Sequence, residues 1–571
     1  MGRMYWMSEN VRVSWWTFMV FMFMAVVLAL NNVYSSLMTG WGGGGSIVAV
    51  FIVLLLLSRR QSNIYLLNLG QTMASAGGSV GFTTSTIAAI YLVDTEFRPS
   101  VIALTFLIVS LSWLGVTVAV PFRRFMVKKF WPEAVAVAVA LREVTSRDPA
   151  VRRRARRLMG TGGVISGILT LPTKLALRAG EGPIWKELSF SEKIKVNLDP
   201  LLFGIGMVVG PRIGLGMVIG AVFTTFLFVP QLAGVGLEEG VIKQYVLWLA
   251  IGLLTIPAFV DPVLMYLFRK EEEVPPGFDS RAEGLEDRLT AKEKLVLSLF
   301  GTLAAVITII TMYTMFGVSS WLTLLALVLS GPACVLLGQV AATTGINPIR
   351  LVAIIFMVFF GALISKMPLA LLALAAVAGA TGATAVDLMQ DLRVGHLINA
   401  RPKRQLKFQY LGVVVGGLPA VLFMNLIVFQ FGIGEGKMFP APGCQAWAGL
   451  AQALSGASSM SSGIWITFIV ASIVGTVIAF FANWPRTSKY VPSVFGMGLA
   501  PLLPMSMSLA IFLGGVARLV ATVFGISDEQ QKERRLKGVY LVGTAVFVAA
   551  GFMGILAVIL IATGVFYLPV D

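Results

Sequence analysis

The chain has 571 residues, of which 57% are hydrophobic and 13% are charged, and its mean hydropathy is +0.85. This apolar content exceeds what a water-soluble fold can bury, so it excludes a soluble globular protein. The formal charge of +16 does not indicate nucleic-acid binding, because the basic residues occur in short loops between apolar runs and form no basic and aromatic face.

Long apolar runs recur along the whole chain. Only helices or closed barrels satisfy their backbone groups in hydrocarbon, and uninterrupted runs of about 17–25 residues indicate helices. The runs occupy 15–37, 44–57, 64–92, 100–121, 160–178, 199–232, 243–267, 293–316, 319–339, 351–384, 407–430, 443–482, 490–521 and 537–567. Several are too long for one helix. Dividing them at Gly and Pro predicts an all-α polytopic membrane protein with about 14–16 transmembrane helices, some of them discontinuous or half-length.

Basic residues between the runs predict the orientation of the chain, because Lys and Arg are enriched in cytoplasmic loops. They suit a cytoplasmic amino terminus and an external carboxyl terminus, and we expect a multi-pass protein of a plasma membrane. The basic stretches are Arg59–Arg60, 123–157, 269–294, 401–407 and 532–537.

One charged segment divides the chain near its midpoint. Residues 271–292 are rich in Glu, Pro and Gly and read as a cytoplasmic linker. We therefore expect an N-terminal transmembrane half at 1–270 and a C-terminal transmembrane half at 293–571.

A small-residue segment at 71–85 provides the first candidate site. Gly allows a helix break whose amides could hold an anion, while the alternative is tight helix packing alone, and the sequence leaves both open. The candidate substrate-binding residues here are Gly77, Gly78, Ser79, Thr83 and Thr84.

A Gly-Pro-Arg sequence lies inside a later apolar run. It predicts a helix break at Gly210 and places the Arg212 guanidinium at membrane depth, where a charge is costly unless paired or hydrated. Arg212 is thus a candidate substrate ligand, or else an interfacial residue paired with Asp199. Asp199 is itself a candidate coupling carboxylate.

Two carboxylates four residues apart lie in the run that ends near 397. Asp387 and Asp391 share one face of a helix, so a proton or cation could lie between them. The basic residues at 401–404 favour another interpretation, an amphipathic surface helix with Arg393 paired to one of the two carboxylates. His396 is a further coupling candidate, although a lone histidine is more often structural.

Two further breaks precede small-residue helices. Residues 345–348 include Asn347, and residues 440–445 include Gln445; both sequences read as starts of half-helices. Such breaks occur at membrane depth only where they are buried or line a cavity, so Asn347 and Gln445 are also candidate substrate ligands.

Metal and cofactor chemistry find little support. The two cysteines, Cys334 and Cys444, and the single histidine supply no ligand spacing. We therefore expect no metal site and no cofactor.

Several collinear motifs resemble the oligopeptide transporter (OPT) superfamily, which includes peptide and yellow-stripe-like metal-chelate transporters. The similar stretches are Ala74–Ser79, Pro132–Glu133, Gly210–Ile213, Ile346–Pro348, Gln390–Gly395, Arg401–Arg404, Pro440–Gln445 and Gly514–Arg518. The resemblance covers about residues 60 to 560. It implies an all-helical transporter of around sixteen spans, with proton-coupled uptake of peptides or peptide-like metal chelates.

Two positions depart from the pattern of the family. Gly78 stands where prokaryotic members carry Glu, and Ala134 stands where a Gly follows the Pro-Glu pair. The Glu could have carried the coupling proton. Either another carboxylate such as Asp199 or Asp391 takes that role, or coupling differs.

The resulting hypothesis is a secondary active transporter of small organic solutes, most plausibly short peptides or peptide-like chelates, with proton symport by alternating access. Its partners would be the substrate, protons and the lipid bilayer, and whether it forms a homo-oligomer is open. The alternative is a polytopic enzyme with an active site at the cytoplasmic face, which would require a cluster of acid, base or metal ligands. We expect no enzymatic activity.

Overall fold

The computed structural model describes residues 13–40, 63–129, 131–146, 148–177, 183, 187–191, 194–268, 289–344, 349–364, 366–456, 461–488, 490–524 and 528–567. Within them, twelve helices are long and apolar enough to cross a membrane, and shorter apolar helices accompany them. The prediction of an all-α polytopic protein with some half-length helices is confirmed. The predicted span 44–57, the linker 271–292 for the most part, and the break at 345–348 lie outside the described residues.

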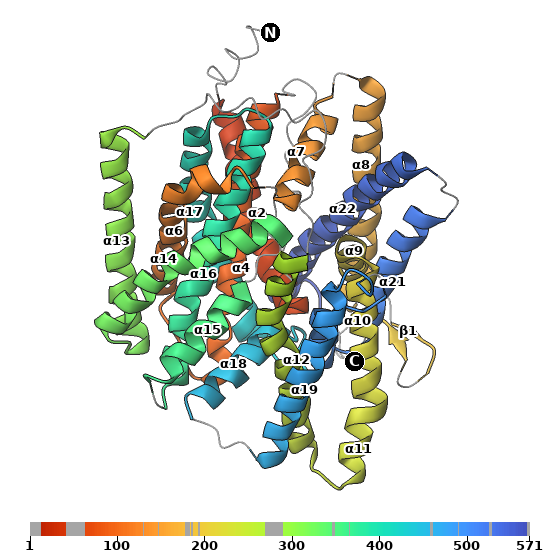
Figure 1. Ribbon diagram of the computed structural model, residues 1–571. Coiled ribbons are helices and arrows are strands. Elements are labelled where there is room, and N and C mark those ends of the chain that lie inside the picture. Colours follow the sequence, from red (N-terminus) through yellow and green to blue (C-terminus); the bar gives the residue numbers. More distant parts are fainter. Residues whose placement is uncertain are drawn as a thin grey trace.

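The helices form two bundles that lie side by side in Figure 1. The first bundle contains α2 (Trp15–Thr39), α4 (Ile64–Ile87), α5 (Ile90–Val93), α6 (Val101–Met126), α7 (Pro132–Val144), α13 (Ala291–Phe316), α14 (Ser320–Thr344), α15 (Ile349–Gly361), α16 (Pro368–Leu397), α17 (Pro402–Leu426) with a π-helical end (Ile427–Phe431), and α18 (Pro442–Leu454). Helix α16 lies at its centre, packed against α4, α6, α14 and α15.

The second bundle contains α8 (Pro149–Lys174), α9 (Pro200–Val209), α10 (Pro211–Val222), a π segment (Phe223–Phe228), α11 (Val229–Gly234), α12 (Glu239–Phe268), α19 (Ser462–Asn483), α20 (Val494–Leu499), a 3₁₀ turn (Ala500–Leu502), α21 (Met505–Val523) and α22 (Glu529–Ala562). A short antiparallel hairpin, β1 (Leu188–Ser189) and β2 (Lys195–Val196), lies between α8 and α9 in the chain.

The second bundle pairs its helices in reverse order along the chain. Helix α8 packs against α22, α9 against α21, α10 against α20, and α12 against α19. Both bundles draw on the chain before residue 270 and after residue 290, so neither bundle coincides with one half of the sequence.

Contacts smaller than those within each bundle connect the two bundles. Helix α2 packs against α22, α7 packs against α8, and α12 packs against α14, α15 and α18. Helix α2 also packs closely against α4 and α17, so it faces both its own bundle and the second one.

Polar and conformationally restricted residues define where helices begin. The side chains of Ser14, Asn63, Asp148 and Asp199 each accept a hydrogen bond from a backbone N–H in the first turn of the helix that follows. Pro occupies the first turn of α8, α9, α10, α16, α17 and α18, where its missing N–H costs nothing.

Peripheral helices present apolar side chains outward. Helices α13 and α19 are the least buried of the long helices. Their exposed positions carry Leu299, Leu303, Val306, Ile310, Ile466, Ile473 and Val477. A surface of this composition is stable in contact with lipid acyl chains, not with water.

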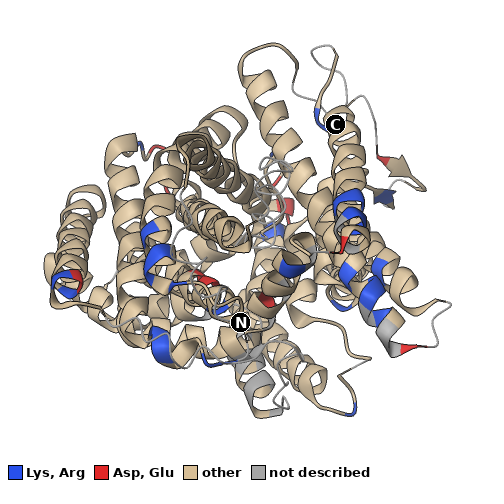
Figure 2. Ribbon diagram, turned by 90° about the horizontal axis from the view of Figure 1, so that it is seen from above, with Lys and Arg blue, Asp and Glu red and all other residues tan. Residues whose placement is uncertain are grey.

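Basic residues concentrate at one end of the molecule, which is viewed face-on in Figure 2. Helix α6 ends there, and α8, α17 and α22 begin there (Figure 1). The exposed basic side chains on these helix ends include Arg124, Lys128, Arg153, Arg154, Arg157, Arg401, Lys532 and Arg534.

Candidate functional site

Helix α2 carries a row of buried polar side chains although it lies between the two bundles. Besides the phenol of Tyr34, the row comprises Asn31, Asn32, Ser35, Ser36 and Thr39, all less than one tenth exposed. Polar groups at this depth are costly unless they are hydrogen-bonded, so each of them requires a partner or a function.

Some side chains of this row have hydrogen-bond partners inside the first bundle. The Asn32 amide donates to the Gly78 carbonyl of α4 at 2.7 Å, and the Ser36 hydroxyl bonds with Ser85 of α4. Thr39 donates to the Ser35 carbonyl of its own helix at 2.8 Å. The Asn32 and Ser36 contacts fasten α2 to α4, and the Thr39 contact lies within α2, so all three have a structural role.

The remainder of the row faces the second bundle. The Asn31 amide and the Ser35 hydroxyl are buried and have no hydrogen-bond partner among the described residues, whereas the buried Tyr34 hydroxyl interacts with the Lys174 ammonium. Asn31 and Tyr34 lie against two glycines of α22: an added Cβ at Gly551 would stand 1.7 Å from Asn31 Oδ1, and one at Gly554 would stand 2.6 Å from the Tyr34 hydroxyl. Glycine at both places leaves room for the Asn31 and Tyr34 side chains where the bundles meet.

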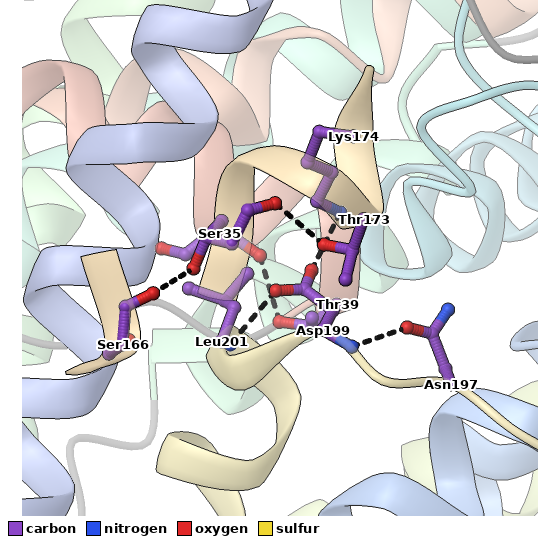
Figure 3. Close-up of polar contacts among 9 residues, drawn as sticks. Ser35, Thr39, Ser166, Thr173, Lys174, Asn197, Asp199 and Leu201 are labelled. Atoms are coloured by element: carbon purple, nitrogen blue, oxygen red, sulfur yellow. Dashed lines mark hydrogen bonds and ion pairs between the residues drawn. The ribbon is translucent and has the colours of Figure 1, made fainter. Parts of the chain in front are cut away.

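A buried ion pair lies next to these unpartnered groups (Figure 3). Lys174 Nζ, at the end of α8, is 2.6 Å from Asp199 Oδ2 at the start of α9, and both side chains are buried. The other Asp199 oxygen accepts from the Leu201 N–H at 2.9 Å. The Lys174 ammonium lies 5.9 Å from the centre of the Tyr34 ring, which brings the pair into contact with α2.

The structure has the predicted helix break at Gly210, whose φ of +89° suits glycine. The side chain that occupies this break is Arg518 of α21, which donates to the carbonyls of Val208 at 2.7 Å and Met207 at 3.4 Å. A cation there stabilises the free carbonyls at the end of α9.

Arg212 lies elsewhere. Its exposed guanidinium donates to the carbonyls of Val491, at 2.9 Å, and Ala482, so it fastens the loop after α19. Pairing of Arg212 with Asp199 was wrong, because Lys174 fills that position.

The break before α18 is also present. Ala441 has a φ of +46°, and its N–H donates to the Leu37 carbonyl at the end of α2 at 2.8 Å. The Gln445 amide donates to the Pro440 carbonyl at 2.5 Å and so closes its own turn. Gly40 at the end of α2 lies against Pro442 of α18 and Leu499 of α20, so three helix ends meet there.

The expected break at 77–85 was wrong, because α4 runs without interruption to Ile87. The hydroxyls of Ser79, Thr83 and Thr84 donate to carbonyls of their own helix, at Ala76, Ser79 and Val80. An added Cβ at Gly77 would stand 2.3 Å from the Ala25 carbonyl oxygen. The small residues therefore allow α2 and α4 to pack closely, as the alternative interpretation had it.

A stability measurement tests this packing role. Gly81→Ala places a Cβ 2.1 Å from the Ala29 carbonyl oxygen, which forces α2 and α4 apart. We expect a loss of about 1–3 kcal/mol, seen as a lower Tm of the purified protein in detergent. Gly160→Ala in α8 is the matched control, since nothing lies within 4 Å of the new Cβ. An unchanged Tm for Gly81→Ala would show that the contact is looser than described.

Asp387 and Asp391 lie in the interior of the first bundle. Asp387 accepts from Ser75 of α4 at 2.6 Å and from Gln409 of α17 at 2.9 Å. Asp391 accepts from Gln71 of α4 at 2.6 Å. The expected surface helix was wrong: α16 is the most buried of the long helices, and the basic residues at 401–404 belong to the start of α17.

The carboxyl end of α16 contains the remaining predicted residues. Gln390 donates to Glu133 of α7 at 2.8 Å, and Arg393 donates to the Val127 carbonyl at 2.6 Å in place of the expected ion pair with an aspartate. His396 is half-buried in the last turn of the helix, near Arg393 and Lys128. These contacts connect α16 to the α6–α7 corner.

Comparison with known proteins assigns the family. Residues 12–561 match the family model described as OPT oligopeptide transporter protein. The chain belongs to this family. A relative from Haemophilus influenzae, named "Putative oligopeptide transporter", is 23% identical over 576 aligned positions, which cover 89% of this chain and 88% of the relative.

Membership of the OPT family and the twelve apolar helices make this chain a multi-pass membrane transport protein. The motifs that carried the resemblance have defined places in the OPT fold of this chain. Gly210 and Arg518 meet at the α9 break, and Ala74–Ser79 lies in the α2–α4 contact.

Sequence reasoning missed the polar row of α2 and Lys174 in this OPT transporter. The row lies within the first apolar run, whose average hydropathy conceals it. Its signal was nevertheless present, because Asn31 and Asn32 are polar residues at the centre of a membrane span. Lys174 follows Pro172 at the end of an apolar run and reads as an ordinary interfacial lysine.

Proposed function

We propose that this OPT protein is a secondary active transporter of short peptides or peptide-like metal chelates, coupled to protons. The observation that carries the proposal is the row of unpartnered polar groups on α2, which lies against a buried ion pair where the two bundles meet. Transporters place substrate and coupling-ion sites between two bodies that move relative to each other. The printed name of the Haemophilus influenzae relative supports a peptide substrate.

Alternating access would come from movement of the two bundles about the α2–α22 contact. Each bundle has extensive internal packing, whereas the helix contacts that join the bundles, such as α2 with α22 and α12 with α14, are smaller. Rigid bodies joined by small interfaces are suited to rocking motions.

The arrangement of charges supports an orientation. Basic helix ends gather at the end of the molecule where α8, α17 and α22 begin, and basic residues are enriched on the cytoplasmic side of membrane proteins. A cytoplasmic amino terminus in a plasma membrane is part of the proposal.

Uptake into proteoliposomes tests the function. A mixed pool of short peptides and peptide–metal chelates is offered with and without an inward proton gradient, and protein-free liposomes are the control. We expect accumulation that rises with the gradient and disappears with a protonophore. Accumulation without gradient dependence would contradict proton coupling, and no uptake by folded protein would contradict the substrate class.

A further inference from the structure

We infer that Lys174 and Asp199 form an exchange site at which the carboxylate of a peptide substrate and one proton bind together. The inference rests on the proposed function and identifies the residues that couple substrate to proton. It assigns Lys174 a role as the ligand of the substrate carboxylate.

The location of the pair is the first argument. Lys174 and Asp199 belong to the second bundle, and the side chains opposite them belong to α2 of the first bundle. The carboxylates Asp387 and Asp391, by contrast, bond to α4 and α17 within the first bundle. If the bundles move as rigid bodies, the surroundings of the Lys174–Asp199 pair change, whereas those of Asp387 and Asp391 do not.

The unpartnered groups of α2 are the second argument. The Ser35 hydroxyl and the Asn31 amide are buried, lie on successive turns, and have no hydrogen-bond partner among the described residues. The Tyr34 hydroxyl beside them interacts with the Lys174 ammonium. Together they present donors and acceptors beside an ammonium group. Such a set suits a carboxylate and the adjacent amide of a peptide better than it suits a sealed structural contact.

The need to keep the site electrically neutral couples binding of the substrate carboxylate to uptake of a proton. The site has no net charge while the ammonium pairs with the carboxylate, and an uncompensated charge at this depth is strongly unfavourable. A peptide carboxylate can displace Asp199 from Lys174 only if Asp199 takes up a proton on Oδ2 in the same event. The site then holds a neutral Asp199 and a second ion pair, Lys174 with the substrate. Release of the peptide and the proton restores the original pair, so one proton accompanies each carboxylate.

The charged neighbours of the pair are few. Tyr34 of α2 is the titratable group that acts electrostatically on Lys174 besides Asp199. The backbone of α9 contributes the Leu201 N–H, which remains bonded to Asp199 Oδ1. The alternative is that the Lys174–Asp199 pair is purely structural and holds the end of α8 against the start of α9. The experiment must separate these two roles.

The test uses two probes in proteoliposomes, trialanine and trialanine with a C-terminal amide. Wild-type protein is expected to prefer trialanine about tenfold or more, because the amide cannot replace the carboxylate at Lys174. Lys174→Gln should take up both probes with equal, reduced efficiency. Asp199→Asn should keep the preference but lose stimulation by an inward proton gradient. A structural pair would instead lower uptake of both probes alike and leave the preference and the gradient response intact.

A double variant gives a result even if the single variants fail to fold. Lys174→Met with Asp199→Leu removes both charges together, and apolar replacement of a whole buried pair is commonly tolerated. We expect it to fold, with neither carboxylate preference nor gradient stimulation. Wild-type behaviour of Lys174→Gln, of Asp199→Asn or of the double variant overturns the inference while the proposed function stands. If wild-type protein takes up the mixed pool of peptides and chelates but neither probe, the inference fails alone; if it takes up neither the pool nor the probes, the proposed function fails as well.

Discussion

Replacing Asp387 with leucine is expected to abolish uptake and to reduce the yield of folded protein. Asp387 accepts hydrogen bonds from Ser75 of α4 and Gln409 of α17, at 2.6 Å and 2.9 Å, and so joins the three helices at the centre of the first bundle. Leucine leaves both donors buried without an acceptor, which costs about 1–3 kcal/mol for each. Thermal unfolding in detergent and uptake into proteoliposomes measure the two effects.

Asp387→Asn is the matched control, since its carbonyl oxygen still accepts a hydrogen bond and the Ser75 hydroxyl can turn to accept one. We expect this variant to fold and to keep its response to an inward proton gradient, in contrast to Asp199→Asn. Loss of gradient response in Asp387→Asn would transfer the coupling role from Asp199 to the first bundle.

A cross-link between the bundles is expected to stop transport completely and reversibly. Asn31 of α2 and Gly551 of α22 lie in direct contact, with Asn31 Oδ1 only 1.7 Å from the position of an added Cβ at Gly551. In a background in which Cys334 and Cys444 are replaced by alanine, Asn31→Cys with Gly551→Cys should form a disulfide on oxidation. Uptake should fall to the level of protein-free liposomes and return when the bond is reduced.

The control cross-link lies within the second bundle. Gly162 of α8 faces Val542 of α22, where an added Cβ would be 3.3 Å from the valine side chain. Gly162→Cys with Val542→Cys joins helices that we expect to move together, so oxidation should leave uptake unchanged. Full activity of the oxidised Asn31–Gly551 pair would show that α2 and α22 belong to one moving body.

The sequence predicted the fold class and several helix ends because these depend on local properties. Apolar runs gave most of the spans, and the Gly-Pro pair at 210–211 gave the α9–α10 break. The common face of Asp387 and Asp391 followed from helical spacing. The surface-helix interpretation failed because the basic residues at 401–404 belong to α17, and residue order alone did not reveal that boundary.

The ion pair could not be predicted from the sequence in the same way. Lys174 and Asp199 are separated by a loop and a hairpin, and their contact depends on how α8 and α9 lie against α22. The burial of Tyr34 and Asn31 depends likewise on glycines more than 500 residues away in the chain. Long-range pairing of this kind is a property of the assembled bundles and has no local signal.

The reverse-order pairing of the second bundle has a consequence for biosynthesis. During synthesis α8, α9, α10 and α12 enter the membrane before the helices with which they pair in reverse order exist, and α8 waits longest because α22 follows α19, α20 and α21 in the chain. Until then, the buried Lys174 and the glycine-rich faces of α9 and α10 are covered by lipid or by the insertion machinery. A ribosome that stalls after α12 leaves a nascent chain with neither bundle complete. Folding of the second bundle therefore depends on α22, so truncations that remove α22 should be degraded more readily than their length suggests.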